Sequence, residues 1–183
     1  MPQPDSATSA RRRFMLNSLP PPVQGSSAPL SASERTGLMA SARALKQSVL
    51  GGAPRPSLRG TNLGLVTESE GSGEAALFQA AALELGARVV CIRPSVAHIA
   101  SPDAVRDTAR VLGRLYAALE CQGLPPAVVA QIRQHAGVPV FDSLAGNDHP
   151  SAALAMELGD EAEGGLNRRC VLQAALLGAL AAA

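Results

Sequence analysis

The first stretch with the pattern of a chemical site is an apolar run that breaks into a loop of Glu, Ser and Gly and then resumes with helical spacing, over residues 62–81. This pattern predicts a strand, a tight loop and a helix. Such a loop directs backbone N–H groups and the positive end of a helix dipole at one place, which is how many α/β proteins bind phosphate. The loop, residues 68–74, carries three glutamates and no Lys or Arg. It has the shape of a phosphate site without the usual cations.

The elements that would position this loop alternate along the chain. Strands are expected at about residues 63–67, 87–92, 115–121 and 138–142, and the intervening helices at about 75–85, 102–114 and 125–135. Further helices are expected at about 33–50, 150–158 and 166–183. Short connections and this alternation predict an α/β, three-layer fold with a four-stranded parallel sheet flanked by helices. Ligands in such folds bind at the carboxyl ends of the strands.

The domain boundary is predicted near residue 30. Residues 1–30 are rich in Pro and Ser with few large apolar groups, so we expect a disordered tail. Residues 31–183 are expected to form a single domain, which includes a C-terminal helix after the linker 159–165. Ser31 and Glu34 have the spacing of a capping box at the first helix of this domain.

Charge and cysteine content exclude several classes of protein. The formal net charge is +1, which does not favour nucleic acid or an anionic membrane as a partner. No apolar segment reaches the roughly 20 residues that a membrane helix needs. Cys91, Cys121 and Cys170 are too widely spaced for a disulfide framework or a zinc site. We therefore predict a cytoplasmic protein with reduced thiols, no cofactor and no dedicated metal site.

Three short segments carry a specific resemblance to a known family: residues 107–116, residues 137–141 and the pair His149-Pro150. They resemble the carbamoyl-phosphate-binding domain of ornithine carbamoyltransferases and, more distantly, of aspartate carbamoyltransferases. The elements from about Ser33 to Gly159 follow that domain in order, and residues 167–177 resemble the family's last helix. Between these two pieces the family has an amino-acid-binding domain, where this chain has only the linker 159–165. The resemblance implies that the second domain, with its ornithine-binding motif, is missing.

The resemblance also identifies a degenerate carbamoyl-phosphate site. The family's Ser-Thr-Arg-Thr-Arg phosphate loop corresponds to residues 71–75, so Ser72, Gly73 and Glu74 stand where the phosphate is bound, and both arginines are gone. The family's Arg-Gly after the third strand is Gln122-Gly123 here. These replacements remove the positive charge from the site, so binding of a small anion is doubtful.

Two histidines complete the predicted site. The family's His-Pro-x-Gln motif begins at His149, so the histidine that polarises the carbamoyl carbonyl is present and the glutamine is replaced by Ala152. His149 can alternatively cap or brace the helix that begins at Pro150. In the loop that family trimers contribute to a neighbouring active site, the glutamine position is His98.

Three functions fit these residues. The first is a catalytically inactive homologue, without catalytic residues, kept as a structural or regulatory protein. It could form the family's trimer through the surface around Asp107 and Thr108, alone or mixed with a carbamoyltransferase chain. The second is a pocket rebuilt for another ligand or a metal, from Glu68, Glu70, Glu74, His98, Gln122 and His149; an ordinary first-turn role for Glu74 would argue against it. The third is residual transferase activity with a partner chain, which needs a new source of positive charge such as Arg93.

Overall fold

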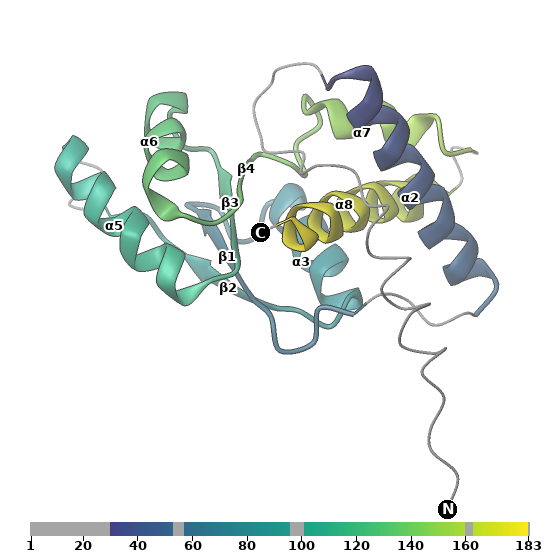
Figure 1. The fold of residues 1–183 in the computed structure, drawn as a ribbon, viewed down its shortest axis with the longest axis horizontal. Coiled ribbons are helices and arrows are strands. Elements are labelled where there is room, and N and C mark those ends of the chain that lie inside the picture. The colour runs from purple at the N-terminus through teal and green to yellow at the C-terminus, as the bar shows by residue number, and fades with distance from the viewer. Residues whose placement is uncertain (1–29, 53–56, 96–100, 160–162, 183) are drawn as a thin grey trace, which may run out of the picture.

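The computed structural model describes residues 30–52, 57–95, 101–159 and 163–182 (Figure 1). The predicted tail, apart from Leu30, lies outside the described residues. So do His98 and positions 160–162 of the predicted linker.

A four-stranded sheet lies at the centre of the molecule, with the strand order β2-β1-β3-β4 (Figure 1). The strands are β1 (Asn62–Thr67), β2 (Arg88–Ile92), β3 (Ala118–Gln122) and β4 (Val140–Asp142). Every neighbouring pair is parallel. Thr67 at the end of β1 pairs with Gln122 at the end of β3. The strand order reverses between these two strands, and their shared carboxyl edge is therefore the place where such sheets bind ligands.

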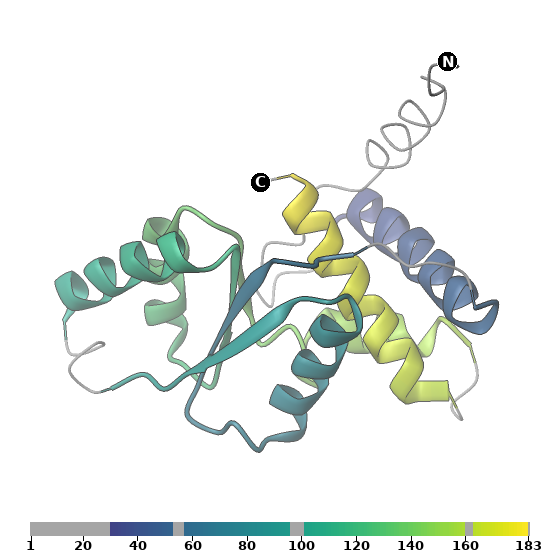
Figure 2. The same cartoon turned by 90° about the horizontal axis from the view of Figure 1, so that it is seen from below.

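Helices cover both faces of the sheet (Figures 1 and 2). On one face lie α5 (Pro102–Leu115) and α6 (Pro126–Ala136), and on the other lie α3 (Gly73–Glu84) and α8 (Gly164–Ala181). Outside α8 lie α2 (Ala32–Leu50) and α7 (Pro150–Met156), which both pack against it. The predicted three-layer α/β fold is confirmed.

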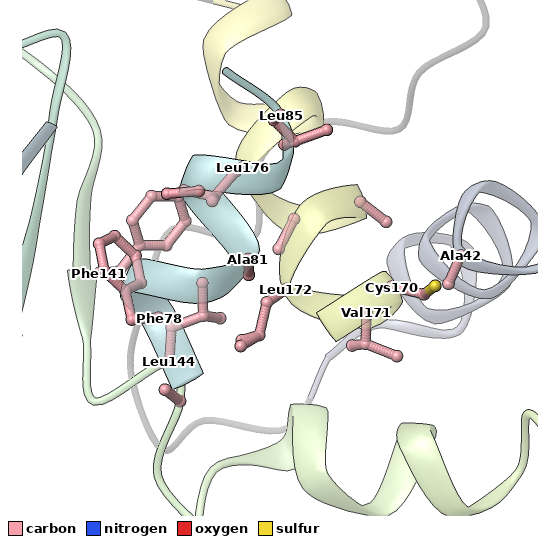
Figure 3. Packing of buried hydrophobic residues seen from close by; sticks show 14 of the residues in the cluster. Ala42, Phe78, Ala81, Leu85, Phe141, Leu144, Cys170, Val171, Leu172 and Leu176 are labelled. Carbon is pink, nitrogen blue, oxygen red and sulfur yellow. The ribbon is translucent and has the colours of Figure 1, made fainter. Parts of the chain in front are cut away.

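Helix α8 is buried between its neighbours and fills the core on its side of the sheet. Leu172 and Leu176 belong to the same apolar cluster as Phe78 of α3, and Cys170 lies beside Ala42 of α2 (Figure 3). Burial of each large aliphatic side chain contributes roughly 1.5–3 kcal/mol. This helix is therefore an integral part of the core.

On the opposite face, α5 and α6 pack without space for a side chain at their closest point. A Cβ added to Gly113 of α5 would lie 1.7 Å from the backbone oxygen of Ala136 at the end of α6. Glycine at this position is what allows the two helices to approach.

The first helix begins as predicted. Ser31 Oγ accepts a hydrogen bond from Glu34 N at 3.2 Å, and Glu34 Oε2 accepts one from Ser31 N at 2.9 Å. The third strand begins later than predicted, at Ala118 rather than Leu115. Helix α5 continues through Leu115, and Tyr116 N still donates to Leu112 O at 3.0 Å. Apolar residues on both sides of this boundary concealed it in the sequence.

Among the described helices, none combines the length and the apolar character needed to span a membrane. No disulfide joins Cys91, Cys121 and Cys170, and the last two are buried.

Candidate functional site

The loop between β1 and α3 is closed by its own hydrogen bonds. Thr67 Oγ1 accepts from Ser69 N at 3.1 Å, and Ser72 N donates to Ser69 O at 3.1 Å. Ser72 is the N-cap of α3, and its Oγ accepts from Ala75 N at 3.1 Å. The Ser72 hydroxyl therefore satisfies a helix donor that an anion would otherwise use.

Glu74 lies in the first turn of α3 and is half-buried against the turn that follows β4. A Cβ added to Gly146 in that turn would lie 3.6 Å from Glu74 Oε1. The carboxylate also interacts with Arg168 of α8: burial lowers the pKa of the Arg168 guanidinium, and the negative charge of Glu74 partly offsets that effect. Glu74 is thus a first-turn carboxylate that also faces the positive charge of another helix.

Gln122 is buried at the end of β3, and its amide is used inside the protein. Gln122 Nε2 donates to Glu120 Oε1 at 3.1 Å. Glu120 has no solvent exposure, and burial raises the pKa of its carboxyl to about 8. Gln122 and the backbone amides of Ala145 and Leu144 donate toward this carboxyl and oppose the rise. The Gln122 side chain is therefore directed to Glu120, on the same face of β3.

His149 is the N-cap of α7. Its Nδ1 accepts from Ser151 N at 3.1 Å and lies 3.0 Å from Ser151 Oγ. Burial, and then the positive charge of Arg168, lower the pKa of the imidazole to about 4. His149 is therefore neutral near pH 7 and, because Nδ1 is an acceptor, carries its proton on Nε2.

Arg168, in the first turns of α8, brings a cation to this region. Its Nη2 donates to Ala145 O at 2.7 Å and to Gly146 O at 3.1 Å, and its Nη1 lies 3.4 Å from Ser151 Oγ. Arg168 is not among the site residues predicted from the sequence. The sequence does contain an indication of it. Arg168 lies three and four positions before the apolar Val171 and Leu172, which are buried, so it lies on the side of α8 that faces the core.

Two further predicted groups, Glu68 and Glu70, do not join this cluster. Glu70 is exposed and pairs with Arg93 across the loop, at 3.4 Å between Oε1 and Nε. Glu68 is exposed as well. Within the described part of the chain, no group of three or more His, Cys, Asp or Glu side chains could hold a metal ion. The structure thus brings together Glu74, His149 and the unpredicted Arg168.

A small apolar cavity of about 30 Å³ lies on the other face of the sheet, beneath α5. Its lining consists of Val66, Ile92, Pro94, Val105, Thr108, Leu112, Leu124 and Ile132. Polar atoms contribute almost nothing to this lining, so the cavity has no means of orienting a charged substrate.

Similarity to known proteins concerns the same part of the chain. The family model "Aspartate/ornithine carbamoyltransferase, carbamoyl-P binding domain" matches residues 26–158. An ornithine carbamoyltransferase of Cutibacterium acnes is 39% identical over 111 residues, which cover 61% of this chain and 33% of that protein. A catabolic ornithine carbamoyltransferase of Burkholderia mallei is 38% identical over 125 residues, which cover 68% and 37% respectively.

A solved structure is similar in fold. The ornithine carbamoyltransferase from Pyrococcus furiosus matches with a TM-score of 0.60 and 23% identity, covering 70% of this chain and 41% of that chain. The present chain spans about a third of the length of the two curated relatives.

Proposed function

Because the chain belongs to the aspartate/ornithine carbamoyltransferase family, we propose that it is a catalytically inactive member kept for a structural or regulatory role. One observation carries this proposal: the polar groups of the former site are bonded to the chain itself. Gln122 donates to Glu120, His149 accepts from the backbone of Ser151, and Arg168 donates to backbone carbonyls. A substrate would have to compete with each of these contacts.

Electrostatics support the same proposal. The loop 68–74 contains no cation, and Glu74 places a carboxylate in the first turn of α3. At about 4 Å and an effective dielectric of 20, one unit charge contributes about 4 kcal/mol. Micromolar affinity corresponds to only about 8 kcal/mol in total. Exchange of one attraction for one repulsion is therefore enough to remove useful affinity for an anionic substrate.

The structural role that we propose is self-assembly, as a homotrimer or as a mixed oligomer with a carbamoyltransferase chain. The outer face of α5 around Asp107 and Thr108 is the proposed contact surface. Val111 and Leu115 on this helix are 54% and 59% exposed, which supports an apolar contact there. We further propose that residues 31–183 act as one domain and that the protein works in the cytoplasm, where thiols stay reduced.

A second candidate is a pocket rebuilt for another small ligand. It is favoured by the approach of Glu74, Arg168 and His149 to the same turn from three helices. The exposed positions of Glu68 and Glu70 argue against this pocket, because of the three glutamates expected to line it only Glu74 lies in the cluster.

Calorimetric titration with carbamoyl phosphate, with inorganic phosphate as the control ligand, tests the main proposal. We expect no heat of binding up to millimolar ligand, and a trimeric mass by light scattering on the same sample. Micromolar binding of carbamoyl phosphate would contradict the proposal and favour residual transferase activity with a partner chain. If the protein binds neither ligand but is a monomer, the result would support the absence of catalytic activity and would show that the proposed assembly role is wrong.

A further inference from the structure

The turn between β4 and α7, residues 143–149, is fixed by unusual backbone geometry and by bonds at both ends. Ser143 has a φ of 53°, in the left-handed region that non-glycine residues rarely adopt. Ser143 N donates to Cys121 O at 2.8 Å, and Gly146 N donates to Ser143 O at 2.7 Å. His149 N donates to Gly146 O at 3.2 Å. We refer to these seven residues as the 143–149 turn.

Side chains of three other elements, β3, α7 and α8, act on this turn. The turn bonds to β3 next to Glu120, through Ser143 N and Cys121 O, and its Leu144 and Ala145 amides lie near enough to the Glu120 carboxyl to act on its pKa. The carbonyl of Ala145 accepts from Arg168 at 2.7 Å. Arg168 and Ser151 thus hold carbonyls of the turn, since Ser151 Oγ donates to Leu144 O at 2.7 Å, while the Glu120 carboxyl lies beside two of its amides.

The Glu120 carboxyl lacks a full set of partners for its ionised form. Glu120 Oε2 and Gln122 Oε1 are both buried and accept no hydrogen bond from the described residues. A carboxylate brings only acceptors to this pair, whereas a neutral carboxyl brings one hydroxyl donor. That hydroxyl supplies a donor next to the Gln122 amide oxygen, which has no other partner among the described residues. The cluster therefore fits a protonated Glu120 better than an ionised one.

The surrounding charges also favour a neutral Glu120, or they are already bonded to other groups. The polar and charged groups facing Glu120 or the turn are Gln122 on β3, Asp142 on β4, His149 and Ser151 at the start of α7, Arg168 on α8 and Glu74 on α3. Asp142 adds a negative charge that disfavours ionisation of Glu120. Arg168 is bonded to carbonyls of the turn, and His149 is neutral. Burial dominates, and the pKa of Glu120 is raised to about 8.

We propose that Glu120 is a proton-dependent latch for the 143–149 turn: the neutral carboxyl keeps the turn packed on the sheet, and loss of its proton releases it. An ionised Glu120 can regain hydration only if water reaches it, and the turn is the layer that its carboxyl contacts. Release would also free the Ala145 and Gly146 carbonyls from Arg168. The site around His149 would therefore rearrange in mildly alkaline solution.

Amide hydrogen exchange measured by NMR tests this latch in the full chain. After correction for the intrinsic rate, protection of the Leu144 and Ala145 amides should fall about tenfold between pH 7 and pH 9, because Glu120 is then about ten parts ionised to one part neutral. In Glu120→Gln, which is neutral at both pH values, protection should stay constant. Glu70→Gln removes an exposed acid and should behave as the wild type.

Constant protection in the wild type would overturn the latch, and so would an equal loss in Glu120→Gln. If Glu120→Gln does not fold, the wild type alone decides. The carboxyl carbon of Glu120, followed in ¹³C-labelled protein, should titrate near pH 8 together with the loss of protection. A midpoint near that of an exposed glutamate would show that the neutral form is not present and that the latch is wrong.

Discussion

Lys46 Nζ on α2 lies 2.6 Å from Glu163 Oε2, immediately before α8, and it also donates to Leu158 O at 3.2 Å. One ammonium group therefore holds both ends of the short connection from α7 to α8. The Lys46 side chain is only 13% exposed, so water screens this contact less than an ordinary surface pair.

Replacement of Lys46 by Met should lower the free energy of unfolding by roughly 1–2 kcal/mol, because it leaves a carbonyl and a carboxylate without their shared donor. Urea unfolding monitored by circular dichroism measures the change. Arg35→Met is the matched control, since Arg35 and Glu157 form an exposed pair between α2 and the end of α7. The control should change stability by less than about 0.5 kcal/mol; equal losses in both variants would contradict the role assigned to Lys46.

Glu120→Gln should remove a pH dependence of stability. The folded protein keeps a proton on Glu120 that the unfolded chain has released, so between about pH 4.5 and 8 stability falls as pH rises. Because burial raises the pKa of this carboxyl to about 8, the loss can reach several kcal/mol. Urea unfolding at several pH values should therefore show that the free energy of unfolding of the variant rises relative to that of the wild type as the pH approaches 8. A constant difference across this range would be inconsistent with a neutral, buried Glu120.

His149→Asn should weaken the loss of stability that occurs as the pH falls, which is the opposite pH dependence. His149 resists protonation in the folded state, so the unfolded chain binds the extra proton and stability falls as pH drops from about 6.5 to 4. Because burial lowers the pKa of this imidazole to about 4, the loss can reach about 3 kcal/mol. Asn keeps a good N-cap, so stability at pH 7 should change by no more than about 1 kcal/mol. Persistence of the full acid dependence in His149→Asn would assign it to another group.

Restoration of charge should restore anion binding. A side chain at Gly73 would meet no atom within 4 Å of its Cβ, so Gly73→Arg fits the first turn of α3. Combined with Glu74→Gln, it exchanges a negative for a positive charge, worth several kcal/mol near 4 Å. We expect millimolar or tighter binding of inorganic phosphate, which corresponds to about 4 kcal/mol. Calorimetry at low and high salt measures it. If the double variant does not bind phosphate, the loss of positive charge is not the only reason why the site does not bind anions.

Charge on the outer face of α5 should disrupt assembly. Leu115→Glu places a carboxylate among the exposed apolar residues of this helix and should lower the mass seen by light scattering to that of a monomer. Leu50→Glu is the control, because Leu50 is 64% exposed at the end of α2, away from α5. Unchanged mass in Leu115→Glu would show that any oligomer uses another surface.

The fold was predictable because its signals are local. Alternating strands and helices, and the capping box at Ser31 and Glu34, depend on residues close in sequence, and all reappear in the structure. The boundary between α5 and β3 was not predictable from periodicity, since residues 115–119 are apolar whether they form helix or strand.

The site was only partly predictable. The resemblance identified Glu74, Gln122 and His149, but not their internal partners, because those depend on how distant elements pack. Glu120 and Gln122 lie two apart on one strand and therefore share a face. In a parallel sheet covered on both sides, that spacing itself indicates a buried polar pair. Arg168 could have been found in a similar way, because it lies on the side of α8 that carries the buried Val171 and Leu172.

The burial of α8 has a consequence for synthesis of the protein. Every strand is translated before α8, yet the apolar face that includes Phe78 is covered only when α8 packs on it. On the ribosome, the emerging chain therefore exposes this apolar surface until α8 has been made. Complete burial of this core therefore has to wait until residues 164–181 have left the ribosome.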